Sequence, residues 1–278
     1  MNEQHEGLTR RQVLTGVGGL AAGLAIGGLG VPSAMASAGQ DAIWPMPYVK
    51  LDPEEVRKLG HRGYYEGECC RGAFSAIVGS LQRKVGAPFT GIPINIMAYG
   101  TAGVAGWCTL CGALNGACAA ISLVSENYKA IANELLQWYV QAPFPSEKAN
   151  ALAVNHQYLV DKYKSDKALP SSVPGSPLCH INVSRWCKEH GYASGSSERS
   201  ERCARISGDV AAYAVELLNM DMDGKFTAMH KPSAEVEGCR VCHRKGKDFE
   251  AGNWTRGKME CGDCHDEATV KLVGPDHP

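Results

Sequence analysis

The sequence predicts a mainly α fold, in which a helical bundle is followed by an irregular C-terminal segment. Apolar residues recur at helical spacing over most of the region from residue 53 to residue 220. Aromatic residues are 7% of the 278 residues, whereas glycine occurs 32 times, which favours closely packed Ala- and Leu-rich helices over an aromatic-filled sheet. Beyond Asp221 the periodicity is lost and the chain becomes polar.

Local signals set the start of the first predicted helices. Asp52 is a good N-cap residue, and Pro53 followed by two glutamates makes a favourable first turn. A second helix is expected from Cys69 to about residue 86, because its apolar residues keep the helical period. The Gly- and Ala-rich stretch over residues 100–125 is expected to form a third, closely packed helix.

Further helices are expected along the rest of the bundle. An amphipathic helix over residues 126–141 ends before Pro143, and Ser146 caps the helix that follows. The next helix ends at Gly191, and the last long helix ends near Met220. Two stretches rich in Ser, Gly and Pro are interpreted as linkers within the bundle, at 168–177 and 193–200.

The N-terminal region is interpreted as an export signal rather than as part of the fold. Arg10 and Arg11 precede an apolar, Gly-rich stretch over 13–30, which is typical of a twin-arginine signal peptide. Alanines at positions 34, 36 and 38 suit a signal peptidase. The alternative is a membrane anchor, but the glycine content makes this stretch a poor bilayer span. We therefore expect a signal peptide over 1–38, export to a bacterial periplasm and no stable membrane span.

Charge and cysteine content narrow the class of protein. The net charge is -1 and no basic run or stripe occurs, so nothing indicates nucleic-acid binding. Twelve cysteines in an exported chain are enough for six disulfides. The chain is nevertheless long enough to bury a core without crosslinks, and its cysteine spacings suit cofactor sites.

Two Cys-x-x-Cys-His motifs lie in the polar segment, within CRVCHRKGKDFEAGNWTRGKMECGDCH at residues 239–265. The 18 residues between the two cysteine pairs are compatible with a four-cysteine zinc ribbon. A zinc ribbon gives no reason for a histidine directly after each pair. Covalent haem c requires one, because two thiols bind the vinyl groups and the adjacent histidine binds the iron.

Two haems c are therefore expected, and as large apolar discs they would supply the core that this polar segment lacks. The residues expected to bind them covalently are Cys239, Cys242, Cys261 and Cys264, with His243 and His265 as axial ligands.

The sixth ligands of the two irons are less constrained by the sequence. His230 is favoured for one, because it lies nine residues before Cys239 in a lead-in that can fold over a haem. Met229 and Met259 are alternatives, and two histidines give a lower potential than His with Met. The other sixth ligand is left open, with a second subunit as one source, among the remaining candidates His277, His61, His180 and His190. For each histidine the alternative is a surface or hydrogen-bonded role.

Eight further cysteines lie in the helical unit: Cys69, Cys70, Cys108, Cys111, Cys118, Cys179, Cys187 and Cys203. Cys108, Cys111 and Cys118 are expected on one helical face. Thiolates that converge from several helices suit an iron–sulfur cluster, which takes about four of them. Buried structural cysteines or disulfides are the alternative. The export signal favours the cluster, because the twin-arginine route carries folded proteins already loaded with cofactor, whereas haem c is added after export.

These cysteines also support a family resemblance. CGALNG, at residues 111–116, resembles the CGAxxG motif of the redox-active family named for its C, CGAxxG, C, C pattern. Cys70 resembles the first cysteine of that pattern, at the head of a helix, and Cys179 and Cys203 resemble the last two, so that the similarity covers roughly 69–220. With the export signal and both haem motifs, the mature chain resembles the split-Soret cytochromes c of sulfate-reducing bacteria.

The resemblance implies a homodimer, two haems per subunit packed closely enough to couple, and a 2Fe–2S or 4Fe–4S cluster in the helical part. It implies Cys70, Cys111, Cys179 and Cys203 as the cluster ligands. Since Cys69 adjoins Cys70 and further thiols lie nearby, other sets remain open, and Cys108 or Cys187 can replace one of the four.

The sequence therefore predicts a periplasmic electron-transfer protein that exchanges electrons with periplasmic redox partners. Its expected parts are the signal peptide over 1–38, the helical cysteine-rich domain over 39–220 and the dihaem segment over 221–278. No Ser-His-Asp set, phosphate-binding loop or carboxylate pair stands out. The alternatives are a haem-based reductase of a small nitrogen or sulfur oxyanion and a haem-based gas or redox sensor.

Overall fold

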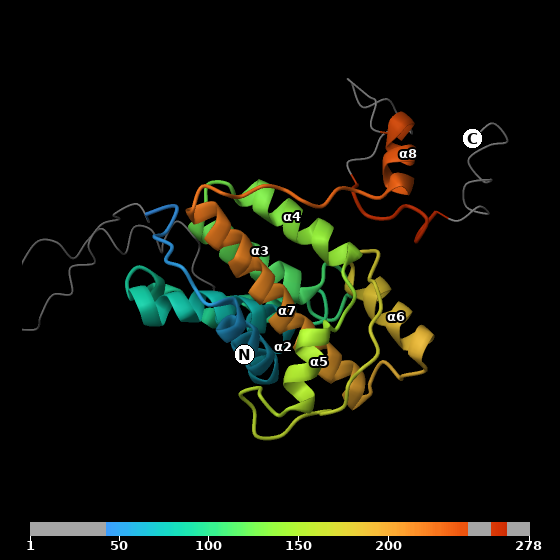
Figure 1. Ribbon diagram of the computed structural model, residues 1–278, viewed down its shortest axis with the longest axis horizontal. Helices are drawn as coiled ribbons and strands as arrows, with labels where there is room; N and C mark the ends of the chain where they lie inside the picture. The colour runs from blue at the N-terminus through green and yellow to red at the C-terminus, as the bar shows by residue number, and fades with distance from the viewer. Residues whose placement is uncertain (1–42, 244–256, 266–278) are drawn as a thin grey trace, which may run out of the picture. The chain divides into compact units, whose positions relative to one another are not determined.

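The computed structural model describes residues 43–243 and 257–265, so the expected signal peptide and His277 lie outside the described residues. The predicted mainly α fold is confirmed (Figure 1). Its helices are α2 (Pro53–Val85), α3 (Gly112–Val124), α4 (Tyr128–Gln141), α5 (Glu147–Val154), α6 (Cys179–His190), α7 (Ser197–Met222) and α8 (Ala234–His243), with the 3₁₀ segments η1 (Phe89–Gly91) and η2 (Ile94–Gly100). In the described ranges, β-structure is confined to isolated bridges. None of the helices there is both long and apolar enough to cross a membrane.

The longest helices, α2 and α7, pack against each other at the centre of the bundle, and α3 and α4 complete its core (Figure 1). The interior is aliphatic and rich in alanine, as the low aromatic content predicts. Ile77, Leu114, Leu135 and Val210, one from each of the four helices, are all fully buried. Burying a side chain of this size contributes about 1.5–3 kcal/mol, so the apolar face of each helix determines which neighbour it packs against.

A buried ion pair attaches α5 to this core. Arg57 of α2 pairs with Asp209 of α7, and both side chains are buried. Asp209 also accepts hydrogen bonds from the backbone N–H of Ser146 at 3.0 Å and from its hydroxyl at 2.7 Å. The same hydroxyl accepts the N–H of Ala149 at 3.1 Å, which confirms Ser146 as the N-cap of α5. The pair therefore fixes the start of α5 as well as the packing of α2 on α7.

The ends of two other helices also follow the sequence signals. Asp52 caps α2 by accepting the backbone N–H groups of Glu54 at 2.7 Å and Glu55 at 3.1 Å. α6 ends at Gly191, which has the left-handed backbone (φ 71°) that glycine adopts readily. α2 is interrupted at Gly67 and Glu68, and Glu68 has a φ of 66°. A new helical run thus begins at Cys69, as predicted.

The expected helix over residues 100–125 is wrong in its first half. The segment from Thr101 to Leu110 is a series of turns, and Ala102, Val104, Ala105 and Cys108 all have positive φ, which excludes a right-handed helix. The segment is instead paired with the chain before α6, where Leu110 forms an isolated bridge with Leu178. Cys108 therefore does not share a helical face with Cys111 and Cys118.

The C-terminal segment contains a helix that the sequence analysis did not predict. α8 includes the first Cys-x-x-Cys-His motif, and Ser233 caps it by accepting the N–H of Val236 at 3.2 Å. Glu235 and Glu237 lie in its first turn, near the positive end of the helix dipole. Ser233, Glu235 and Glu237 therefore mark the start of a helix in the sequence. The prediction missed this helix because the segment has no apolar periodicity.

Candidate functional site

Four cysteine thiols from four separate elements lie within electrostatic range of one another. Burial and the neighbouring thiols of Cys111 and Cys203 raise the pKa of Cys69. Burial and the thiols of Cys111, Cys203 and Cys69 raise the pKa of Cys179 in the same way. Cys69 begins the helical run after the break in α2, and Cys111 is the N-cap of α3. Cys179 begins α6, and Cys203 lies within α7. We refer to Cys69, Cys111, Cys179 and Cys203 as the thiol cluster.

Backbone pairing between two loops brings Cys111 and Cys179 together. The N–H of Cys111 donates to the carbonyl of Pro177 at 2.8 Å, and the N–H of Cys179 donates to the carbonyl of Thr109 at 2.7 Å. A third bond joins the N–H of His180 to the carbonyl of Cys108 at 3.0 Å. The turns that replaced the predicted helix thus hold the start of α3 against the start of α6.

The doubled cysteine at the head of the second helical run puts two thiols near Cys111. Cys70 is fully buried, and burial together with the Cys111 thiol raises its pKa to about 12. Cys69 interacts with Cys111, Cys203 and Cys179. The sequence pattern pointed to Cys70 as the first ligand, whereas Cys69 is the thiol of the pair that interacts with all three other candidates.

Two of the remaining three thiols of the helical unit adjoin members of the thiol cluster. Cys108 lies in the turn segment and interacts with Cys179, and Cys187 on α6 interacts with Cys203. Cys118 lies two turns along α3 from Cys111, and burial raises its pKa to about 11. All twelve cysteines are free thiols, so the disulfide alternative has no support in this structure.

The thiol cluster has the number of cysteines that an iron–sulfur cluster takes as ligands. Within the described ranges, no group of three or more Cys, His, Asp or Glu side chains is arranged to hold a single metal ion. One ion needs every thiolate in a shell of about 2.3 Å. In a 2Fe–2S or 4Fe–4S cluster four thiolates are shared among several iron atoms, so they lie further apart. The thiol cluster supplies four such thiols from four separate elements.

A buried arginine next to the thiol cluster also fits a negatively charged cofactor. Arg202 is fully buried, donates from Nη2 to Asn182 at 2.6 Å and lies over the Trp186 ring at 5.1 Å. Its Nη1 has no hydrogen-bond partner among the residues that the structure describes. Burial lowers the pKa of Arg202, and the adjacent thiols of Cys203 and Cys111 oppose that shift. A thiolate-bound cluster would supply the counter-charge that this guanidinium lacks.

Two glycines of the CGALNG sequence allow α3 to pack very close to α2. Gly112 and Gly116 are one helical turn apart, on the face of α3 that meets Cys69 and Cys70. A methyl group on Gly112 would lie 2.3 Å from Sγ of Cys69, and one on Gly116 would lie 2.1 Å from the carbonyl oxygen of Cys70. Only glycine permits this approach, so the motif holds the first cysteines beside Cys111.

We expect Gly116→Ala to destabilise the protein by about 3 kcal/mol, because the added methyl group would overlap a backbone atom that cannot move aside. Gly79→Ala is the matched control, since a methyl group there meets its nearest atom at 3.7 Å, in the middle of α2. That change should stabilise the protein by about 0.5–1 kcal/mol. Chemical denaturation of both variants measures the two effects, and equal stabilities would contradict the close contact.

The two Cys-x-x-Cys-His motifs pack against each other. Cys239, Cys242 and His243 lie in the last turns of α8, and Cys261 to His265 form a turn closed by the N–H of His265 on the carbonyl of Cys261 at 2.9 Å. Burial and the neighbouring Cys239 thiol, which lies in hydrogen-bond reach, raise the pKa of Cys261. The first thiols of the two motifs therefore lie next to one another.

Polar contacts connect the second motif to α8 and to the helical unit. The N–H of Gly262 donates to Glu235 at 3.1 Å, and the hydroxyl of Ser233 donates to Glu260 at 2.9 Å. Arg185 of α6 forms an ion pair with Asp263, which lies between the cysteines of the second motif. The second motif thus contacts the helix that begins at Cys179.

His230 is held by a buried carboxylate. Its Nδ1 lies 2.6 Å from Oε1 of Glu134, a fully buried residue of α4. Glu134 also accepts the backbone N–H groups of Met229 at 3.0 Å and His230 at 3.1 Å. Burial raises the pKa of Glu134, but these hydrogen bonds outweigh it and keep the pKa below its ordinary value. The lead-in to the haem motifs is therefore attached to α4 at this point.

The other histidines and the two methionines have different surroundings. His61 is fully buried, contacts Glu201 through Nε2 at 2.8 Å and stacks on Tyr158 at 3.7 Å. His180 is exposed at the start of α6, and His190 is half-buried beside Trp186 at its end. Met229 and Met259 are both exposed. His61 is thus enclosed by protein groups, whereas His180 and His190 lie nearer the surface.

Comparison with known proteins agrees with this arrangement. Residues 69–217 match the model of the family described as "Putative redox-active protein (C_GCAxxG_C_C)". The chain is 38% identical, over 92% of its length and 94% of the relative, to the split-Soret cytochrome c of Desulfovibrio desulfuricans. This chain belongs to the split-Soret cytochrome c family. A solved structure of the Desulfovibrio desulfuricans protein, described as containing a novel iron centre, matches with a TM-score of 0.69 and 34% identity, over 84% of this chain and 95% of that one.

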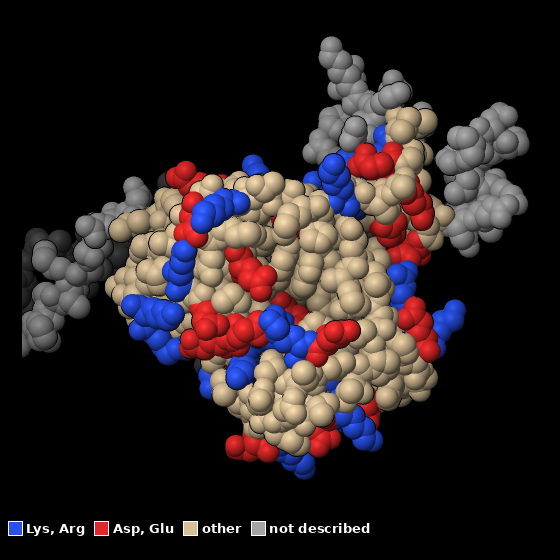
Figure 2. Space-filling view, in the orientation of Figure 1, with Lys and Arg blue, Asp and Glu red and all other residues tan. Residues whose placement is uncertain are grey.

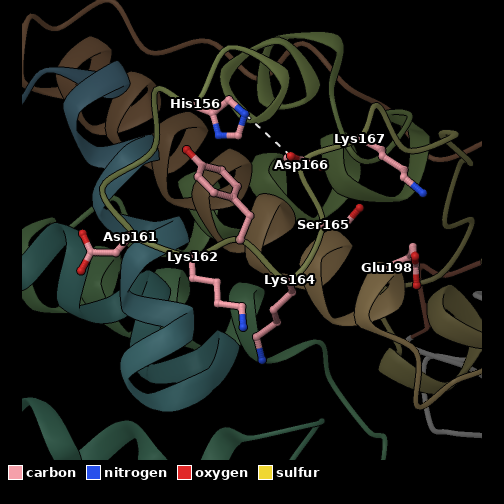
Figure 3. Close-up of a pocket in the computed structure, with 9 residues that line it drawn as sticks. His156, Asp161, Lys162, Lys164, Ser165, Asp166, Lys167 and Glu198 are labelled. Atoms are coloured by element: carbon pink, nitrogen blue, oxygen red, sulfur yellow. Dashed lines mark ion pairs between the residues drawn. The ribbon is translucent and has the colours of Figure 1, made fainter.

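A polar pocket lies between the loop that includes residues 156–167 and Glu198 in the first turn of α7 (Figure 3). His156 and Asp166 face each other there at 3.7 Å, and three lysines and three carboxylates contribute to the lining. Figure 2 shows the same mixture of signs over one face of the molecule, where acidic and basic side chains are interspersed. Neither feature concentrates one sign of charge enough to select a charged ligand.

Three residues around the thiol cluster and His230 were not predicted from the sequence. Arg202 had one available signal, since it directly precedes Cys203 in the sequence. Glu134 and Tyr139 lie on an ordinary amphipathic helix, and only the fold shows that they are buried beside His230 and Cys111. Sequence reasoning found the thiols and histidines but not the groups that surround them.

Proposed function

We propose that this chain is a dihaem c-type electron-transfer protein with an iron–sulfur cluster in its helical part. Membership of the split-Soret cytochrome c family supports haem-based electron transfer. The two Cys-x-x-Cys-His motifs and the thiol cluster supply two different kinds of redox site in one chain. Single electrons would pass between them without any catalytic side chain.

One helix connects the two sites, and this observation supports a relay most directly. Tyr139 of α4 adjoins the Cys111 thiol, and Glu134, five residues earlier on the same helix, holds His230. At a rise of 1.5 Å per residue, about 7.5 Å separates the two residues along the helix axis. A rigid element thus contacts the thiol cluster near its C-terminal end and the lead-in to the two Cys-x-x-Cys-His motifs at its middle.

The haem-binding residues are assigned from the two motifs. Cys239 and Cys242 would bind one haem covalently, and His243 would be its axial ligand. Cys261 and Cys264 would bind the other, with His265 as its axial ligand. When bound, haem supplies reversible one-electron exchange at its iron. The contact between Cys239 and Cys261 supports two haems that lie side by side.

The thiol cluster is the proposed site of the iron–sulfur cluster. The relative from Desulfovibrio desulfuricans is described as having a novel iron centre, and we assign an iron centre of this chain to Cys111, Cys179 and Cys203 with Cys69. Cys70 remains the alternative first ligand, and Cys108 and Cys187 remain substitutes because they adjoin Cys179 and Cys203. Either 2Fe–2S or 4Fe–4S is compatible with four thiolates.

The remaining parts of the proposal concern assembly and location. We assign residues 1–38 to a twin-arginine signal, 39–220 to the cysteine-rich domain and 221–278 to the dihaem segment. The protein would act in the periplasm as a homodimer that exchanges electrons with periplasmic redox proteins. The second sixth haem ligand would come from His180, His190 or His277, of the same subunit or its partner, or from His61 if its contacts rearrange.

The spin state of the haems tests electron transfer against the enzymatic and sensory alternatives. An electron carrier is expected to have two six-coordinate, low-spin haems in the holoprotein. Optical and EPR spectra should then remain unchanged when nitrite or sulfite is added, and the ferrous protein should not bind carbon monoxide. A high-spin signal that shifts with either oxyanion would favour a reductase, and ready carbon monoxide binding would favour a sensor.

A further inference from the structure

Glu134 is an unusual residue to find inside the helical bundle. Its side chain is fully buried, yet the carboxylate accepts hydrogen bonds from four donors. Oε2 accepts the N–H groups of Met229 at 3.0 Å and His230 at 3.1 Å. Oε1 accepts the hydroxyl of Tyr213 at 3.2 Å and faces Nδ1 of His230 at 2.6 Å. With every strong acceptor position taken by a donor, the geometry fits an ionised carboxylate.

The charge partner of this carboxylate is a histidine rather than a permanent cation. Among the described residues, the ion pair recorded for Glu134 is with His230, and no lysine or arginine pairs with it. Burying a carboxylate costs free energy of folding unless the group is fully hydrogen-bonded. Replacing a buried ion pair by apolar residues of similar size often leaves a protein equally stable. Four donors converging from α7 and from the segment before α8 therefore indicate a role beyond packing.

The contact also fixes which nitrogen of His230 can bind a metal. An ionised carboxylate only accepts hydrogen bonds, so Nδ1 of His230 has a proton where it faces Glu134. In the neutral imidazole, which is the form that binds a metal, Nε2 is then left with its lone pair. The His230 side chain is 28% exposed, so part of the ring lies outside the bundle. A carboxylate on the far nitrogen orients a ligating imidazole and increases its electron donation to the metal.

We propose that Glu134 is a positioning residue that prepares His230 to bind haem iron through Nε2 and lowers the reduction potential of that haem. The inference rests on the proposed function, since it takes His230 as a sixth ligand. It adds the group that fixes the ring, its tautomer and its basicity. It also gives α4 a direct effect on one of the two haems.

The test compares Glu134→Gln with Glu126→Gln in the full-length holoprotein. Both changes remove one carboxylate near or within α4, but Glu126 is exposed. Redox titrations followed optically should show one haem of the Glu134→Gln protein shifted to a higher potential, with the other haem unchanged. The low-spin EPR g-values of the shifted haem should change too. The Glu126→Gln protein should titrate like the wild type.

His230→Ala separates this inference from the proposed function. If His230 is a sixth ligand, one haem should become high-spin in this variant while the other stays low-spin. Two unchanged low-spin haems would overturn the role of His230 and of Glu134, but electron transfer through two haems would stand. A ligand loss in His230→Ala together with an unshifted potential in Glu134→Gln would reduce Glu134 to a structural residue. If Glu134→Gln does not fold, Tyr213→Phe, which removes the 3.2 Å bond to Oε1, should produce a smaller shift of the same haem.

Discussion

Replacing Cys239 and Cys242 together with alanine is expected to halve the covalent haem content, from two haems per chain to one. The two thiols of this motif lie one turn apart at the end of α8, and without them no thioether bond can form there. The second motif, at residues 261–265, keeps its own thiols and histidine. The haem content is measured by the pyridine haemochrome of denatured, washed protein, which retains only covalent haem.

A variant that also loses two thiols, but outside the motifs, is the matched control. Cys118→Ala with Cys187→Ala removes the same number of sulfur atoms from the helical unit and should retain both haems. Cys261→Ala with Cys264→Ala should again leave one haem, now on the first motif. Two covalent haems in either motif variant would show that the attachment sites are assigned wrongly.

Cys111→Ser is expected to abolish the non-haem iron of the protein. Cys111 interacts with the other three members of the thiol cluster, Cys69, Cys179 and Cys203, and also with Cys70. It also caps α3 at the point where the loops before α3 and α6 are paired. Non-haem iron per chain and the EPR signal of the reduced protein should both fall to background, while two haems remain.

Cys118→Ser on the same helix provides the control, because Cys118 lies seven residues further on and contributes to none of these thiol interactions. It should retain all of the non-haem iron. Cys69→Ser and Cys70→Ser then decide which of the doubled cysteines is the ligand, and we expect the greater loss for Cys69. A Cys111→Ser protein with its full iron content would remove the thiol cluster as a metal site.

The features that the sequence predicted correctly depend on short stretches of chain. Asp52, Ser146 and Gly191 begin or end helices through their own side chain or backbone, so each can be recognised from its neighbours. The Cys-x-x-Cys-His motifs are equally local, since a haem needs both thiols and the histidine within five residues, although haem binding at these residues stays a prediction. The helical period identified most of the bundle for the same reason.

The features that it missed depend on contacts between distant segments. The turns before α3 are stabilised by pairing with the chain at 177–180, and that pairing overrides the Gly- and Ala-rich composition that suggested a helix. Whether Cys69 or Cys70 faces the other thiols depends on the break at Gly67 and Glu68 and on how closely α3 approaches α2. Glu134 was missed because its partner His230 lies 96 residues away.

Total iron and haem iron, determined on one sample of the holoprotein, test the central claim that this chain combines two haems with an iron–sulfur cluster. We predict two haem irons per chain and, in addition, two or four non-haem irons, with an iron–sulfur EPR signal in the reduced protein. A total of two irons per chain, all of them in haem, would contradict the cluster and leave the thiol cluster without a redox role.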